Sequence, residues 1–339
     1  MRFGKRVDRL IMLFGVMFLL TACGLPGGGP SAEEGDTLQV VASTTFIGDV
    51  VGEIAGEDVE VTVLLEPGQN PHAYQPIPRD VALVSEADFF FVNGFQLEGF
   101  LDDLLTGSDS AESVVVVSEG IEPLLVGAHD HQEDEGHEGE DHAEDGPDHQ
   151  EDDGHEGEGH EDEGLGRDPH VWFDPNNVMI WAENIASALA EADPENAGAY
   201  QERAEDYIEQ LEELDGWIRS RVETIPPEHR KLVTDHTSFG YFAEEYGFEQ
   251  IGAVVPAPTT EAEASGQQLA ELVDTIRETG VRVIFVSADT DPSLAERIAE
   301  DTGAEVVALY FGSLTAGEPA GTYLEFMRSN VETIAAALK

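Results

Sequence analysis

The sequence has little of three things: cysteine, basic residues and long apolar runs. Cys23 is the only cysteine among 339 residues, so the chain cannot form an internal disulfide. Lysine and arginine together number 16 against 71 aspartates and glutamates, which gives a formal net charge of −55. Because so acidic a chain has no basic patch to neutralise phosphate, nucleic acid and anionic lipid are poor partners, and we expect no binding to nucleic acid. The charge favours a cationic ligand, although selection for general solubility would produce the same excess.

The apolar run at the start of the chain, residues 10–20, is too short for a membrane span of about 20 residues. Four basic residues precede it, and Leu-Thr-Ala-Cys follows at 20–23. This order is typical of an export signal, and its end resembles a bacterial lipobox. We predict a signal peptide at 1–22, a lipidated Cys23 and a flexible tether at 23–36, with an uncleaved anchor as the alternative. The protein is then exported and attached to the outer face of the bacterial cytoplasmic membrane.

Strand-like and helix-like segments alternate along the rest of the chain. The apolar runs are nearly continuous, which is typical of parallel strands covered by helices on both faces. Strands are expected at 38–43, 59–65, 88–93, 114–118, 231–235, 248–254, 282–287 and 305–309. Helices are expected at 46–55, 78–85, 97–105, 177–192, 239–246, 263–279, 293–301 and 323–338.

One long amphipathic pattern separates the two groups of strands. Apolar residues recur at helical spacing from Tyr200 to Val222. We expect Asp193 to cap this helix, Pro194 to occupy its first turn, and the proline pair at 226–227 to end it.

These patterns predict an α/β fold of two doubly wound lobes, residues 37–193 and 230–339. A single long, rigid helix within 194–229 would join them, and a ligand would bind in the cleft between the lobes.

Residues 129–164 differ sharply in composition from the lobe that contains them. They include eighteen carboxylates and no lysine or arginine. Such a segment buries too little apolar surface to fold, so we expect a disordered loop. Since imidazole and carboxylate both bind divalent metals, this acidic tract is either an accessory zinc collector or a solvated insert. It holds seven of the eleven histidines: His129, His131, His137, His142, His149, His155 and His160.

Four histidines lie outside the acidic tract. His72 and His170 each follow an Asn-Pro or Asp-Pro pair, and His236 follows the predicted strand at 231–235. Ligands of open α/β sheets bind beyond the carboxyl ends of the strands, so these three rings are expected to meet between the lobes. Three neutral imidazoles suit Zn²⁺. The fourth, His229, is expected on the surface.

Three motifs resemble those of the solute-binding proteins of zinc and manganese ABC importers. They are Gly-Gln-Asn-Pro-His-Ala-Tyr-Gln-Pro at 68–76, Asp-Pro-His-Val-Trp-Phe-Asp-Pro at 168–175 and Asp-His-Thr-Ser-Phe-Gly-Tyr-Phe at 235–242. Asn93-Gly94 and Leu97-Glu98 resemble a further landmark. The resemblance covers residues 37–339, and a His-rich acidic insert is typical of zinc-type members. It implies two α/β lobes on a rigid helical backbone, with the metal between them.

The resemblance also implies that His72, His170 and His236 are metal ligands. Manganese-type members carry an aspartate where this chain has Gly312. Asp289 is a candidate fourth ligand, with water as the alternative. Because manganese prefers oxygen ligands, the missing aspartate favours Zn²⁺ over Mn²⁺, although copper or nickel would also suit three imidazoles.

We therefore expect a monomeric zinc-binding protein, not an enzyme, that delivers Zn²⁺ to an ABC transporter permease in the membrane. One alternative is a manganese importer subunit or a metal-dependent adhesin. Another is a zinc hydrolase, since three histidines and an open position also form catalytic zinc sites. Against the hydrolase, the sequence contains neither His-Glu-x-x-His nor Gly-x-Ser-x-Gly.

Overall fold

The computed structural model describes residues 38–105, 113–126 and 166–339. The predicted signal peptide, the tether with Cys23, and the acidic tract with its seven histidines lie outside the described residues. None of the described helices combines the length and apolarity that a membrane crossing requires.

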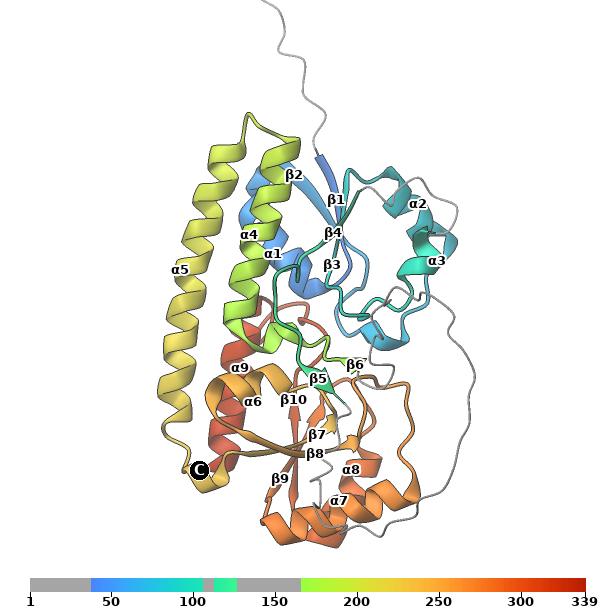
Figure 1. Cartoon of the computed structure of the whole chain (residues 1–339), viewed down its shortest axis with the longest axis vertical. Coiled ribbons are helices and arrows are strands. Elements are labelled where there is room, and N and C mark those ends of the chain that lie inside the picture. The colour runs from blue at the N-terminus through green and yellow to red at the C-terminus, as the bar shows by residue number, and fades with distance from the viewer. Residues whose placement is uncertain (1–37, 106–112, 127–165) are drawn as a thin grey trace, which may run out of the picture. The chain divides into compact units, whose positions relative to one another are not determined.

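The first lobe is built on a parallel sheet of four strands in the order β2-β1-β3-β4 (Figure 1). Alternate residues of β1 face opposite sides. Val40 and Ala42 pack with α1 and α4, whereas Val41 packs with α2 and α3. The sheet is therefore covered on both faces, as predicted. The elements are β1 (Leu38–Ala42), α1 (Thr45–Ala55), β2 (Val59–Val63), α2 (Pro78–Glu86), β3 (Phe89–Val92), α3 (Leu101–Leu105), β4 (Val114–Val116) and α4 (Pro175–Ala192).

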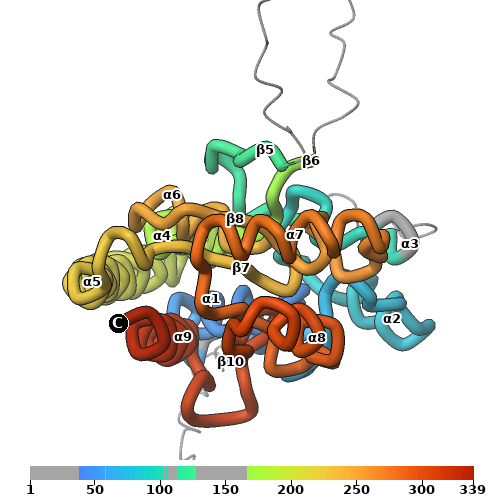
Figure 2. Tube along the Cα trace, turned by 90° about the horizontal axis from the view of Figure 1, so that it is seen from below, coloured from blue at the N-terminus to red at the C-terminus, as the bar shows by residue number. Residues whose placement is uncertain are grey.

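The second lobe repeats this plan with a parallel sheet in the order β10-β9-β7-β8. Val233 and Ile284 pack with α7 and α8, whereas Leu232 and Phe285 belong to the larger core cluster on the other face. Figure 2 shows that α9 lies beside α5, whereas α7 and α8 lie well away from α5. The elements are β7 (Lys231–His236), α6 (Gly240–Tyr246), β8 (Glu249–Val255), α7 (Gly266–Thr279), β9 (Val283–Ser287), α8 (Ser293–Thr302), β10 (Glu305–Leu309) and α9 (Tyr323–Leu338).

The long helix α5 (Ala197–Val222) contacts α1 of the first lobe and α9 of the second, and it packs against α4, beyond which its C-terminal turns extend (Figure 1). It is shorter than the predicted segment 194–229. Asp193 does not cap it. Instead the Asp193 carboxylate accepts hydrogen bonds from Asn196 N and Nδ2, which closes a turn between α4 and α5. The helix ends in a turn before the short 3₁₀ helix η5 (Pro227–His229).

The helix predicted at 97–105 is also shorter, because α3 begins at Leu101. Residues 97–100 lie in a bend and a turn instead, and Phe95 and Gln96 before them have positive φ values of 49° and 63°. The Glu98 carboxylate fixes this loop by accepting from Asn93 N at 2.7 Å and from Gly94 N at 3.1 Å.

Two kinds of short element were not predicted. The strands β5 (Leu125–Val126) and β6 (Gly166–Arg167) form an antiparallel pair, which protrudes from the rest of the chain at the top of Figure 2. The 3₁₀ helices η1 (Gly56–Asp58), η2 (Pro71–Ala73) and η4 (Val171–Phe173) interrupt the loops. The predicted metal-binding residue His72 lies within η2, and His170 directly precedes η4. Helix α7 begins at Gly266 rather than 263, because Ser265 caps it by accepting from Gln268 N.

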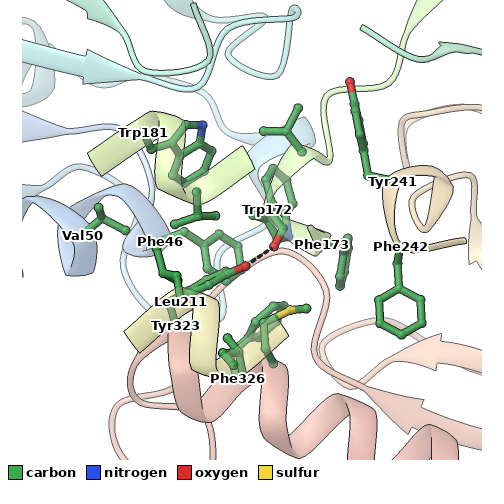
Figure 3. Packing of buried hydrophobic residues seen from close by; sticks show 14 of the residues in the cluster. Phe46, Val50, Trp172, Phe173, Trp181, Leu211, Tyr241, Phe242, Tyr323 and Phe326 are labelled. Atoms are coloured by element: carbon green, nitrogen blue, oxygen red, sulfur yellow. Dashed lines mark hydrogen bonds between the residues drawn. The ribbon is translucent and has the colours of Figure 1, made fainter. Parts of the chain in front are cut away.

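A continuous aromatic core joins the two lobes (Figure 3). Trp172 stacks on Phe46 of α1 with ring centroids 5.0 Å apart, and the neighbouring Phe173 lies 4.0 Å from Phe239 of the second lobe. Tyr323 of α9 donates a hydrogen bond to the carbonyl of Trp172 at 2.8 Å. Because one apolar core spans the junction, the lobes can shift against each other but cannot swing widely apart.

Candidate metal centre

Three histidines that are far apart in the sequence meet at one point. His72 lies in η2 after β2, His170 precedes η4, and His236 is the last residue of β7. The Nε2 atom of His170 lies 3.1 Å from Nε2 of His72 and 3.1 Å from Nε2 of His236. Three ligand atoms, one from each ring, lie within 4.8 Å of one another. The structure therefore brings together the three rings that the sequence singled out.

The spacing of these nitrogens suits a tetrahedral metal ion. Ligands about 2.05 Å from a tetrahedral Zn²⁺ lie about 3.3 Å apart, close to the two measured separations. The rings line a cavity of about 60 Å³, to which Ser287, Thr290 and Phe311 also contribute. That volume accommodates an ion and a single water, since a water takes up about 30 Å³.

The ring of His170 is held by a carboxylate. Asp168 Oδ1 lies 2.7 Å from Nδ1 of His170 and also accepts from its backbone N at 3.0 Å. With Nδ1–H donated to the carboxylate, the lone pair of Nε2 is left for a metal. Asp168 thus both orients the ring and closes the turn at His170. Gly240 makes room for it, because a Cβ there would lie 2.6 Å from Asp168 Oδ2.

His236 is held in the same way by its neighbour. Asp235 Oδ1 lies 2.7 Å from Nδ1 of His236, and Asp235 Oδ2 accepts from Ser287 N at 2.8 Å and from Thr290 Oγ1 at 3.3 Å. We did not predict this role for Asp235. The pattern that could have revealed it is an aspartate directly before a histidine at the end of a strand.

His72 is held differently. Its backbone N donates to Asn70 Oδ1 at 3.0 Å, while Asn70 Nδ2 donates to Thr260 Oγ1 of the second lobe at 2.6 Å. Within the described ranges, no carboxylate accepts a hydrogen bond from the His72 ring. The residue is half-buried, whereas His170 and His236 are 1% and 4% exposed.

Both lobes fix the chain next to His170. Asn93, at the end of β3, donates its side-chain amide to the carbonyl of Pro169 at 3.0 Å. Tyr241 of α6 donates its hydroxyl to the carbonyl of Asp168 at 3.3 Å. Because each lobe supplies one of these hydrogen bonds, His170 is the fixed centre of the site. Neither Asn93 nor Tyr241 was predicted to have this role.

Burial keeps the imidazoles neutral. Burial, followed by the neighbouring His170 and His236, lowers the pKa of His72 to about 2. Burial, followed by the neighbouring His236, also holds the pKa of His170 well below its usual value. Only neutral imidazole binds a metal ion, so burial favours the form that the site needs. Burial also raises the pKa of Asp168 to about 7, against the hydrogen bond from His170 N.

The remaining predicted positions lie around the cavity or away from it. Asp289 lines the cavity and is exposed, but among the described residues the ligand group contains only the three histidines. Gly312 also lines the cavity, and a Cβ there would lie 3.1 Å from Cδ of Pro71, beside His72. His229 is half-buried rather than on the surface. Its Nδ1 lies 3.0 Å from the carbonyl of Leu338, far from the site in sequence and fold.

The sequence matches the family described as "Zinc-uptake complex component A periplasmic" (ZnuA) over residues 40–337. It is 31% identical over 336 residues to the manganese-binding lipoprotein MntA of Halalkalibacterium halodurans, which covers 98% of this chain and 99% of the relative.

Two solved structures have similar folds. One is the Mn-bound periplasmic metal binding protein from Candidatus Liberibacter asiaticus, with a TM-score of 0.72 and 27% identity over 89% of this chain and 100% of that one. The other is the periplasmic zinc binding protein TroA from Treponema pallidum, with a TM-score of 0.72 and 27% identity over 89% of this chain and 99% of that one. Similar folds thus occur in proteins described with manganese and with zinc.

Proposed function

The chain belongs to the zinc-uptake complex component A family, and on that premise we propose that its cargo is Zn²⁺. Members of this family are metal-binding components of ABC importers and not enzymes, so the prediction of a non-enzymatic solute-binding protein is confirmed and the hydrolase alternative is wrong. In our proposal the chain captures Zn²⁺ outside the cell and delivers it to a permease.

The observation that supports zinc is the donor set. Three Nε2 atoms converge, two of them oriented by carboxylates that are not themselves ligands. A site of three imidazoles favours Zn²⁺, whereas Mn²⁺ prefers oxygen. Water, or Asp289 after a local movement, completes a tetrahedral shell in this proposal. The position that holds an aspartate in manganese-type members is Gly312, which has no ligand to offer.

Mn²⁺ is the second candidate cargo. The relative named above is a manganese-binding lipoprotein, and it resembles this chain over nearly its whole length. To bind Mn²⁺ tightly, the site would need oxygen ligands from Asp289 and one or more waters. Nothing in the site favours the adhesin role that the sequence also left open.

We also propose that the division of the chain made from its sequence holds: a signal peptide at 1–22, lipidated Cys23 and tether at 23–36, lobes at 37–193 and 230–339, and a connecting segment at 194–229. The relative's name, which includes the word lipoprotein, supports the anchor. A Cys23→Ser variant should be released from membranes and lose incorporation of a radiolabelled fatty acid. The protein should sediment as a monomer with and without metal.

Calorimetric titration tests the cargo. Residues 24–339, stripped of metal, should bind one Zn²⁺ tightly and Mn²⁺ far more weakly. Deletion of residues 129–164 should remove only weak additional sites, if the acidic tract collects zinc. Loss of the tight site on that deletion, or tight binding that survives His72→Ala, would contradict the assignment.

A further inference from the structure

The contacts of Asn70 link the His72 turn (residues 66–73) to the opposite lobe. The side chain of Asn70 uses both ends of its amide. Its Oδ1 accepts from His72 N at 3.0 Å, and its Nδ2 donates to Thr260 Oγ1 at 2.6 Å. Thr260 belongs to the loop between β8 and α7, so a single side chain bridges a candidate metal ligand and the other side of the cleft.

A second hydrogen bond supports the same turn. Gly68 N donates to Ser313 Oγ of the second lobe at 2.8 Å, and Ser313 is 5% exposed. Pro71 packs near Gly312 of the same loop. The His72 turn belongs to the first lobe by sequence, but two hydrogen bonds place it against the second.

These contacts supply what the His72 ring lacks. Asp168 and Asp235 orient the other two rings within their own segments, and neither of those contacts depends on the distance between the lobes. The position of His72 does depend on the distance between the lobes, because residues of the second lobe hold the His72 turn.

We propose that Asn70 and Thr260 form an interlobe clasp that positions His72, so that His72 is the ligand withdrawn when the clasp opens. This inference rests on the proposed metal-binding function of the three histidines. With the clasp closed, the three Nε2 atoms converge and the ion is held. When it opens, the turn carries His72 away, and the two remaining imidazoles hold zinc too weakly to keep it from a permease.

The test is Thr260→Val in the full chain, which removes the hydroxyl and keeps the size of the side chain. Zinc bound at the tight site is released into excess chelator, and its dissociation rate is followed by stopped flow. Loss of one hydrogen bond should speed release by about three- to tenfold. Thr260→Ser keeps a hydroxyl and should restore the wild-type rate. Thr275→Val is the matched control, because the hydroxyl of Thr275 donates only to the carbonyl of Glu271 in its own helix.

A second arm separates positioning from general damage. In a His72→Ala background, Thr260→Val should change zinc affinity no further, since there is no ring left to position. An equal loss of affinity in both backgrounds, an unchanged release rate in Thr260→Val, or failure of Thr260→Ser to restore the rate would overturn the clasp. A different result would contradict the proposed function. If the single variant His72→Ala binds zinc with wild-type affinity, then His72 is not a ligand.

Discussion

The two sides of the metal centre are built differently. His170 and His236 are almost fully buried, and each has its Nδ1 atom 2.7 Å from an aspartate oxygen. His72 is half-buried and is placed through its backbone by Asn70. The difference teaches that two of the rings are oriented by a neighbouring carboxylate within their own segments. The position of the third ring depends on how the two lobes meet.

This asymmetry suits a protein that must bind tightly and then release. A site of three rigid ligands would lower the free energy of the bound state but leave no route for the ion to escape. A shared aromatic core limits the movement of the lobes to a small shift. A small shift is enough, provided that one ligand is held across the junction.

The largest effect is expected for His170→Ala. The His170 ring lies between the other two, with Nε2 3.1 Å from each of theirs. Its removal leaves two rings without a bridging donor, so zinc affinity should fall by more than about a thousandfold. His72→Ala should cost less, because His170 and His236, each oriented by an aspartate, remain. Competition with a chelator of known affinity measures both, and a smaller loss for His170→Ala than for His72→Ala would reverse the comparison.

Removing the orienting charges should have the next largest effect. Asp168→Asn and Asp235→Asn keep the shape of each side chain but weaken the hold on Nδ1. Loss of such a partner typically lowers metal affinity by about 10- to 100-fold. Fluorescence titration of zinc against a competing chelator would show it. Asp289→Asn is the control at the cavity wall, and an effect there as large as in Asp168→Asn would instead identify Asp289 as a ligand.

Gly312→Asp should change the preference between metals. The added carboxylate supplies the oxygen ligand that Mn²⁺ favours, so the ratio of manganese to zinc affinity should rise by about tenfold. The new Cβ would lie 3.1 Å from Pro71 and disturb the His72 turn, so both affinities should also fall. Gly312→Ala isolates that steric part and should leave the ratio unchanged. If the alanine variant shifts the ratio equally, the carboxylate is not responsible.

The smallest effect concerns the stability of the metal-free chain at low pH. The folded pKa of His170 is depressed, so the unfolded chain binds more protons below pH 6.5, and stability is present above that pH and lost as pH falls. His170→Gln should remove about 1 kcal/mol of this loss between pH 7 and 5.5. His72→Gln should remove a similar amount, because burial lowers the pKa of His72 to about 2. Thermal melts at the two pH values test this, and no gain in either variant would contradict the burial of these rings.

Much of the fold could be predicted from the sequence. The eight parallel strands of the two lobes all lie within two residues of the predicted ranges, because continuous apolar runs bounded by turn residues mark buried parallel strands. The start of α5 was wrong, since an Asp-Pro pair suits a helix start and a tight turn equally well. Only the folded structure shows that the Asp193 carboxylate accepts hydrogen bonds from Asn196 and so forms a turn.

The candidate site was predictable in part for a similar reason. His72, His170 and His236 stand out because proline pairs or strand ends precede them. Thr260 and Asn93 do not stand out, because each acts on a segment far away in the chain. Hydrogen bonds between distant segments leave no local pattern in a single sequence, so only the folded structure reveals them.

X-ray absorption at the zinc K-edge tests the central claim most directly. The chain without residues 129–164, loaded with one equivalent of Zn²⁺, should show three imidazole nitrogens at about 2.0–2.1 Å and one further light ligand. His72→Ala should show two imidazoles and more oxygen. A shell with two or fewer imidazoles in the unsubstituted chain, or one dominated by oxygen, would contradict a zinc site made by His72, His170 and His236.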